Sequence, residues 1–159
     1  SPLLYFTSSD DDDLISRSLE FRDNVIPSSN SIMAKNLFKL YHYFDRKEFY
    51  DKSKDMALAV SFEFDDYPSG YSNWFDVLYN FKSNFYEVAV LGNEAVEKSN
   101  LINLKYLPNK LIVGSNTKND LPLLKNRFVE GKTLIYVCVN KTCKLPTENT
   151  SESITMIKF

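Results

Sequence analysis

Glycine is scarce in this chain of 159 residues, and positive and negative charges nearly balance. Only four glycines are present, and none of them lies in a G-x-G-x-x-G or G-x-x-x-x-G-K pattern. Those patterns let a backbone approach a phosphate closely, so their absence argues against dinucleotide-binding and P-loop proteins. The net charge is −2, with 19 basic and 21 acidic residues interspersed, and no basic face of the kind that binds nucleic acid is visible. We therefore expect no nucleic-acid partner.

Residues that bind metals or form disulfides are also few. Two cysteines and one histidine cannot form a disulfide scaffold or, without further ligands, a four-ligand zinc site. The sequence therefore predicts no metal, no other cofactor, and a reducing, cytoplasmic compartment. The longest apolar runs are far shorter than the ~20 residues that span a membrane, so we expect no membrane partner.

Apolar and aromatic residues, by contrast, are abundant, at 43% hydrophobic and 14% aromatic. This composition is typical of a globular protein rather than a disordered one, and the length suffices for one domain or two small ones. The pattern changes near position 85 from helical spacing to short apolar runs. We therefore predict a mixed fold, with a helical part over residues 1–84 and a small α/β unit over residues 85–159.

The densest polar sequence, residues 23–31, stands directly before the clearest amphipathic helix. Apolar residues recur at helical spacing after it, which predicts a helix over residues 29–44. Ser28 or Ser29 can cap this helix by accepting a hydrogen bond from an otherwise unpaired backbone N–H group. The two serines therefore mark where the helix begins.

A single cap leaves the other polar side chains of this junction unexplained. The N-terminus of a helix has a partial positive charge and free N–H groups, so polar side chains there can help to bind an anion or a polyol. The candidate ligand-binding residues are therefore Asp23, Asn24, Ser28, Asn30 and Ser31. The alternative is that Asp23 and Asn24 form a turn and that the serines only cap the helix.

Two further helices are predicted in the helical part. The first runs from a cap at Asp45 to about residue 64, and its short linker to the preceding helix indicates an αα-hairpin. The second spans residues 72–82 and carries Trp74, the only tryptophan. His42, the only histidine, lies off the apolar stripe of its helix, and we interpret it as a surface residue.

Three shorter segments of the helical part allow more than one interpretation. Residues 3–6 are an apolar run that suits a strand or a buried extended segment. The four aspartates at residues 10–13 are typical of a solvated turn or a first helical turn, because calcium loops need alternating ligands and a glycine. Asp65 and Asp66 could act as an acid and a base, but their turn-rich surroundings favour a solvated loop.

Apolar runs and helical patterns alternate after position 85. Strands are predicted over residues 86–91, 110–113 and 133–138, with helices over residues 94–103 and 121–127 between them. Near-continuous apolar strands separated by helices are typical of a parallel sheet with both faces covered. We therefore predict a three-stranded parallel sheet, closed by a short helix or strand over the last ten residues.

Cys138 and Cys143 lie at the end of the last predicted strand and just beyond a short loop. Their spacing permits a disulfide if the loop turns back. It is not the C-x-x-C spacing of a thioredoxin, and no neighbouring histidine would stabilise a thiolate. We therefore expect two reduced cysteines, one of them buried.

Three segments together resemble a known protein family. Residues 23–31 are similar to its motif D-N-x-x-P-S-x-N-S, residues 136–146 are similar to Y-V-C-x(4)-C-x-x-P, and the strand E-V-A-V-L-G at residues 87–92 lies between them at a fitting distance. The family comprises thioredoxin-domain proteins and includes spermatogenesis-associated protein 20 and bacterial relatives. Ser29 stands where many members have glycine, and the likeness covers nearly the whole chain.

The resemblance implies a longer protein, in which a thioredoxin-like domain precedes an (α/α) toroid of the six-hairpin glycosidase type. No part of residues 1–159 corresponds to that domain or to the early hairpins. This chain would therefore be the C-terminal fragment of a bacterial member, and the missing N-terminal part would be its partner. The loops at one end of such a toroid line a central cleft, where residues 23–31 would lie. The family has no settled reaction, so we assign no catalytic residue.

Three functions follow as hypotheses. The parent protein could bind or modify a carbohydrate-like ligand, using the junction residues. The chain could instead be an interaction module that docks on the rest of the protein or forms a homo-oligomer. The third hypothesis is redox work by Cys138 and Cys143 beside a thioredoxin partner.

Overall fold

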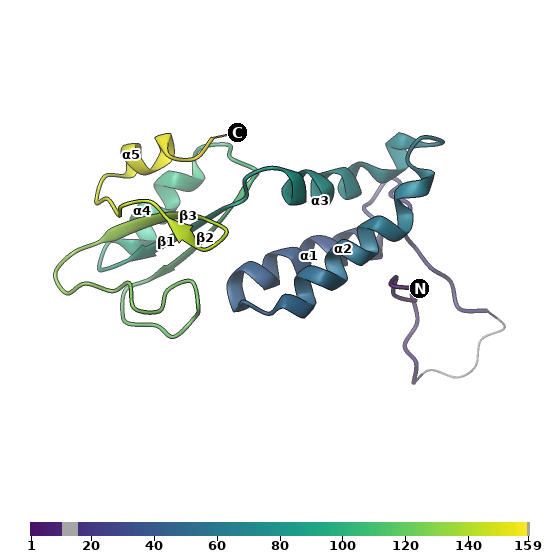
Figure 1. The fold of residues 1–159 in the computed structure, drawn as a ribbon, viewed down its shortest axis with the longest axis horizontal. Helices are drawn as coiled ribbons and strands as arrows, with labels where there is room; N and C mark the ends of the chain where they lie inside the picture. The colour runs from purple at the N-terminus through teal and green to yellow at the C-terminus, as the bar shows by residue number, and fades with distance from the viewer. Residues whose placement is uncertain (11–15, 159) are drawn as a thin grey trace. The chain divides into compact units, whose positions relative to one another are not determined.

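The structure of this chain is a computed structural model that describes residues 1–10 and 16–158. Within these residues the fold is mixed, and it divides into two compact units (Figure 1). The first unit comprises Ser1–Tyr41 and Arg46–Lys82, and the second comprises His42–Asp45 and Ser83–Phe159. The end of the first long helix therefore belongs to the second unit.

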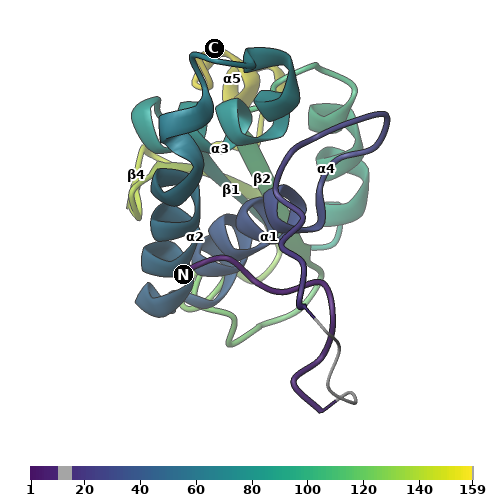
Figure 2. The ribbon, with the colours of Figure 1, turned by 90° about the vertical axis from the view of Figure 1, so that its right-hand side faces the viewer.

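The first unit is helical. Its elements are α1 (Ser29–Phe44), α2 (Lys47–Val60), α3 (Ser72–Lys82) and two short 3-10 helices, η1 (Ser61–Glu63) and η2 (Pro68–Tyr71). The bounds of α1 and α3 match the predicted helices. α1 and α2 lie side by side in both views, as expected for an αα-hairpin (Figures 1 and 2). The long predicted second helix instead ends at Val60 and continues as a 3-10 turn.

The core of the first unit lies where α1, α2 and α3 bring their apolar faces together. Ala34, Met56, Val60 and Trp74 are all buried in it. Close contact between α1 and α2 is supported by a hydrogen bond from Ser53 Oγ to the carbonyl oxygen of Ala34, at 2.8 Å. Small residues at such a contact allow two helices to approach closely, and burial of the large side chains supplies most of the stabilisation.

The second unit contains a small sheet with two helices. Its elements are β1 (Tyr86–Leu91), α4 (Ala95–Asn103), β2 (Lys110–Ser115), β3 (Leu134–Val139), β4 (Thr142–Cys143) and α5 (Thr150–Thr155). β1 has the predicted bounds, and the other two long strands lie within two residues of theirs. The final segment forms a helix, which was one of the two predicted outcomes.

The prediction of a three-stranded parallel sheet was wrong. The sheet has four strands in the order β2-β1-β3-β4, and only β1 and β2 are parallel. The reason lies in residues 121–127, where a helix was predicted but the chain forms only turns. A parallel crossover is usually built around a helix, and without one the chain returns antiparallel to β1.

The two faces of the sheet differ in character because successive side chains of a strand point to opposite sides. One face carries Val88, Val90 and Ile135 in an apolar core with α4 and α5. The other face carries the alternate residues, among them Glu87 and Cys138, which are paired across β1 and β3. Residues 121–127 contact this second face, through a bond from the Tyr136 hydroxyl to the carbonyl oxygen of Arg127, at 2.8 Å.

Several local predictions need correction. Asp45 does not cap α2, because it has a left-handed backbone with a φ of 56° and the N-cap position is Arg46. Residues 3–6 form neither a strand nor a buried segment, since only Leu3 is buried. Of the acidic run at residues 10–13, only Asp10 is described, and it is exposed. The rest of that run lies outside the described residues.

Candidate functional site

The carboxylate of Asp23 organises the polar junction before α1. Its Oδ1 accepts hydrogen bonds from the backbone N–H of Ser28 at 3.0 Å and from the hydroxyl of Ser31 at 2.7 Å. Its Oδ2 accepts a hydrogen bond from the backbone N–H of Asn73, at the start of α3, at 2.8 Å. One buried side chain thus holds the approach to α1 and the start of α3 together.

Ser28 and Asn30 also direct their polar atoms inward. Ser28 Oγ accepts from the backbone N–H of Ser31 at 3.1 Å, which is the predicted cap. Asn30 Oδ1 accepts from the backbone N–H of Leu4 at 2.7 Å, and its Nδ2 donates to the carbonyl oxygens of Leu4 and Glu20, both at 2.8 Å. Asn30 therefore fastens the first residues of the chain to the N-terminal turn of α1.

The pKa of Asp23 reflects these hydrogen bonds. Burial of the carboxyl group opposes its ionisation, but the hydrogen bonds from Ser28, Ser31 and Asn73 outweigh burial and hold the pKa of Asp23 below its ordinary value. The group is therefore a charged structural acceptor at neutral pH.

Four of the five candidate ligand-binding residues thus have internal partners. Asp23, Ser28, Asn30 and Ser31 are buried and bonded within the first unit, while Asn24 is exposed. Their contacts account for a scaffolding role, and a ligand-binding role for them stays a prediction. The serines do more than cap, since Ser31 also donates to the carboxylate.

Exposed apolar side chains lie near this buried polar cluster in the sequence. They lie on the two segments that Asp23 and Asn30 fasten and on the first turn of α1. We call this set the apolar rim, and it comprises Leu4, Tyr5, Phe6, Val25, Ile26 and Ile32. Val25 is 96% exposed and Ile26 is 69% exposed, although the chain on both sides of them is fixed by Asp23. The rim is therefore an apolar surface on segments that hydrogen bonds fix in place, and its burial against a partner would be favourable.

A second polar cluster lies in the second unit and was not foreseen. His42 Nδ1 lies 2.7 Å from Glu87 Oε1, and the two side chains are 4% and 1% exposed. The interpretation of His42 as a surface residue was therefore wrong. The available signal was Glu87, a charged residue inside the apolar run of β1, because a buried carboxylate needs a partner.

Cationic groups complete this second cluster. Glu87 Oε2 accepts from the backbone N–H of Lys141 at 2.9 Å, and the Lys141 ammonium pairs with Asp45. Arg127 lies beside them, and its pKa is lowered by burial, an effect that the negative charge of Glu87 opposes. A cavity of about 70 Å³ lies among the side chains of His42, Asp45, Glu87, Arg127 and Lys141. That volume is far below the roughly 300–1,000 Å³ of ligand pockets, so the cavity is too small for a sugar.

The two cysteines lie on the same face of the sheet as Glu87. They form a disulfide between β3 and β4, so the expectation of two reduced cysteines was wrong, although Cys138 is buried as predicted. The reason is the connection between the strands, in which Asn140 and Lys141 both have positive φ values, of 48° and 65°. Such a two-residue turn returns the chain at once and places Cys138 opposite Cys143.

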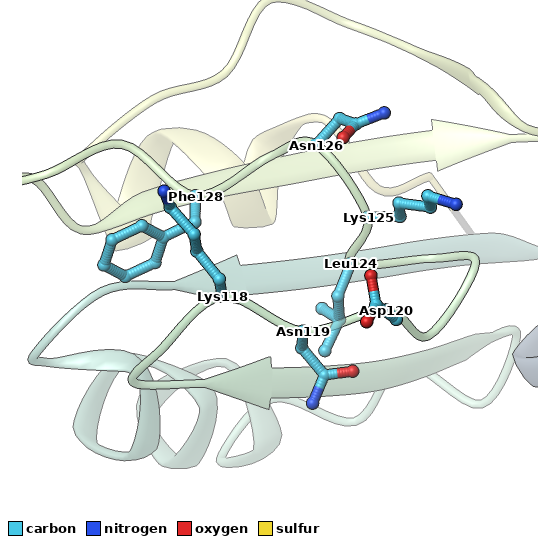
Figure 3. Close-up of a pocket in the computed structure, with 7 residues that line it drawn as sticks. All are labelled: Lys118, Asn119, Asp120, Leu124, Lys125, Asn126 and Phe128. Atoms are coloured by element: carbon cyan, nitrogen blue, oxygen red, sulfur yellow. The ribbon is translucent and has the colours of Figure 1, made fainter.

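A larger hollow in the second unit is formed by the loop between β2 and β3 (Figure 3). It measures about 410 Å³ and is lined by amide, charged and apolar side chains: Lys118, Asn119, Asp120, Leu124, Lys125, Asn126 and Phe128. Figure 3 shows Asn119 and Asp120 on one side of the loop, with the ring of Phe128 farther along it. Amides, a carboxylate and an aromatic ring are groups that contact polar small molecules.

The other candidate sites considered from the sequence were an acid–base pair, a metal site and a membrane span. Asp65 and Asp66 are both exposed in a loop, as the solvated interpretation requires. Within residues 1–10 and 16–158, no three His, Cys, Asp or Glu side chains are placed to hold a metal ion. No helix in the described part of the chain is long and apolar enough to cross a membrane.

Comparison with known proteins identifies relatives at low identity. The chain is 24% identical to human spermatogenesis-associated protein 20 over 142 residues and 25% identical to the rat protein over 151 residues, which covers 82% and 88% of this chain. It is also 24% identical, over 93% of its length, to an uncharacterized protein of Caenorhabditis elegans. No family model matches the chain, and neither does any solved structure. The relatives named here are animal proteins, so they do not support the bacterial origin expected from the sequence.

The matches extend over most of this chain but only a small part of each relative. The aligned segment covers 18% of the human protein, 19% of the rat protein and 22% of the worm protein. The chain thus spans about a fifth of the length of the curated relatives it matches, and it is distantly similar to spermatogenesis-associated protein 20.

Proposed function

We propose that this chain is a docking module of a longer protein, and that the apolar rim binds the preceding part of the same polypeptide. The observation that carries the proposal is the exposure of Val25 and Ile26 on a loop held in place by Asp23. A loop that is fixed and apolar at its tip suits an interface, because little conformational entropy remains to be lost on binding. The fivefold greater length of the relatives supports a partner within the same protein.

The identity of that partner comes from the family resemblance. We propose that the preceding part contains a thioredoxin-like domain and the earlier hairpins of an (α/α) toroid, and that the first unit closes this toroid. The buried polar cluster would then serve docking indirectly, since it sets the positions of the two segments that carry the rim.

The proposal is tested by adding the preceding part of the protein to this chain in trans and measuring the affinity by calorimetry. A Val25→Asp, Ile26→Asp variant should bind at least a hundredfold more weakly, because each buried aliphatic side chain contributes about 1.5–3 kcal/mol. The matched control is Leu145→Asp, at a residue that is 87% exposed in the second unit. Unchanged affinity for the rim variant would refute the proposal, and rim-dependent dimerisation of the chain alone would identify a second copy as the occupant instead.

A second candidate function is binding of a carbohydrate-like ligand by the parent protein. The specific observation in its favour is the hollow of Figure 3, which combines the amides of Asn119 and Asn126 with Asp120 and the ring of Phe128. Sugars present hydroxyl groups to amides and carboxylates and an apolar face to aromatic rings. At the predicted junction, by contrast, Asn24 alone of the five candidates is exposed.

Chemical-shift perturbation with a panel of mono- and disaccharides tests this second function. Shifts at Asn119 and Phe128 that disappear in a Phe128→Ala variant would support it. Shifts centred on Asn24 would return the ligand site to the junction, and no shifts at millimolar sugar would rule out both sites in this chain.

A further inference from the structure

The two cysteines of the disulfide differ in their exposure to solvent. Cys138 is on the interior strand β3 and is 1% exposed, whereas Cys143 is on the edge strand β4 and is partly exposed. A thiolate from another molecule can therefore approach the sulfur of Cys143, while that of Cys138 is covered. Attack at Cys143 makes Cys138 the leaving group.

Arg127 contacts the sulfur that would leave. Its Nη1 donates to Cys138 Sγ at 3.4 Å, and the guanidinium group lies over the ring of Tyr136, 5.5 Å from its centre. The hydroxyl of Tyr136 in turn donates to the carbonyl oxygen of Arg127, so the arginine is held at both ends. A cation fixed beside a sulfur atom stabilises a thiolate and makes it a better leaving group.

Hydrogen bonds hold the hairpin that carries the cysteines in addition to the disulfide. The backbone N–H of Lys144 donates to the carbonyl oxygen of Val137 at 3.0 Å, and that of Lys141 donates to Glu87. With the turn at Asn140 and Lys141, we expect these bonds to keep the strands paired when the S–S bond opens. The two thiols would stay opposite each other and could re-form the bond.

We propose that Cys138 and Cys143 form a reversible thiol–disulfide exchange site that is reduced by a dithiol, with Cys143 as the attacked sulfur and Cys138 as the leaving group stabilised by Arg127. The proposal is independent of the docking function, because none of these residues belongs to the apolar rim.

The exchange proceeds in two displacements. A thiolate of the dithiol attacks Sγ of Cys143, the S–S bond breaks, and Cys138 leaves with the electron pair as a thiolate beside Arg127. The second thiol of the reductant loses its proton to solvent and attacks its own partner sulfur in the mixed disulfide, which releases Cys143. Both cysteines then take up protons from solvent, so the protein gains two electrons and two protons and the dithiol becomes a disulfide.

The first test measures the rate at which dithiothreitol reduces the folded chain, followed by rapid alkylation and mass spectrometry. An Arg127→Gln variant should be reduced about fivefold more slowly, because the leaving thiolate loses its cation. Arg127→Lys should recover most of the rate, and the matched control Arg46→Gln, at an exposed arginine paired with Glu48, should react like the unmodified chain. Equal rates for Arg127→Gln and the unmodified chain, or reduction only after unfolding, would overturn the proposal.

The second test identifies the attacked sulfur in the unmodified chain and so does not depend on the folding of any variant. The chain is treated with a monothiol, glutathione, and the mixed disulfide is located by peptide mapping after acid quenching. Glutathione on Cys143 agrees with the proposal. Glutathione on Cys138, or no mixed disulfide while the chain stays folded, contradicts it.

Discussion

Two carboxylates are buried among the described residues, one in each unit, and they are stabilised in different ways. Asp23 accepts three hydrogen bonds from uncharged donors, and two of these come from residues five and eight positions along the chain. Glu87 instead faces His42, 45 positions away, and the backbone of Lys141, 54 positions away. The first carboxylate mainly stabilises a local turn, whereas the second connects segments that are distant in sequence.

Under the two proposals, the clusters have separate roles. The Asp23 cluster has its donors and acceptors matched within the first unit, and the exposed groups beside it are apolar. The Glu87 cluster includes Arg127, and Arg127 donates a hydrogen bond to the disulfide sulfur of Cys138. We therefore associate the first cluster with docking and the second with chemistry.

The largest expected effect comes from removing Glu87. Truncation to Ala removes the hydrogen-bond partner of His42 Nδ1 and the acceptor of the Lys141 backbone N–H. Each buried polar group that loses such a bond costs about 1–3 kcal/mol, so we expect a loss of about 4 kcal/mol. Urea unfolding followed by circular dichroism measures the change in the free energy of unfolding. A double variant, Glu87→Leu with His42→Phe, should recover most of the loss, because apolar side chains of similar size can replace a buried polar pair. Additive losses in the double variant would show that the two side chains act separately.

A smaller loss is expected from Asp23→Asn, which keeps the shape of the side chain. The amide has one oxygen in place of two, so it cannot accept all the hydrogen bonds from Ser28, Ser31 and Asn73. One or two buried donors lose their acceptor, at a cost of about 2 kcal/mol in the same unfolding measurement. Asp65→Asn, at an exposed loop residue, is the matched control and should change stability by less than about 0.5 kcal/mol. A loss no greater than that of the control would mean that Asp23 does not organise the junction.

The pH dependence of Asp23 distinguishes its charge from its shape. Because the pKa of Asp23 is lower in the folded chain than in the unfolded one, its stabilisation is fully present above its ordinary pKa of about 4. It is lost as the pH falls through the lower folded pKa. The stability difference between the unmodified chain and Asp23→Asn should therefore be constant from pH 7 to about 5 and shrink below about 4. A difference that does not change with pH would contradict a role for the ionised form.

Much of the fold was predictable from the sequence because its signals are local. Helical spacing and a serine cap defined α1, and a continuous apolar run defined β1. The direction of β3 was not predictable in this way, since it depends on whether residues 121–127 form a helix. The contact between His42 and Glu87 depends on the tertiary fold, and only the charge inside β1 pointed to it. The disulfide similarly depends on the two-residue turn that begins at Asn140. The spacing of the two cysteines alone was compatible with either a disulfide or two reduced thiols.

The smallest effect is expected from Asn30→Ala, and it should be local. Asn30 fastens Leu4 to α1 by two hydrogen bonds, but the exposed segment around Leu4 can detach and bond to water instead. The loss of global stability should therefore be only about 1 kcal/mol, even though a buried polar side chain is removed. Hydrogen exchange should nevertheless accelerate at the Leu4 amide and leave β1 unchanged. Because Leu4 belongs to the apolar rim, this variant should also weaken docking. The loss of affinity should be smaller than that caused by the double substitution at Val25 and Ile26. Slow exchange at Leu4 in the variant would show that other contacts hold the segment, and the rim would then not depend on the buried cluster.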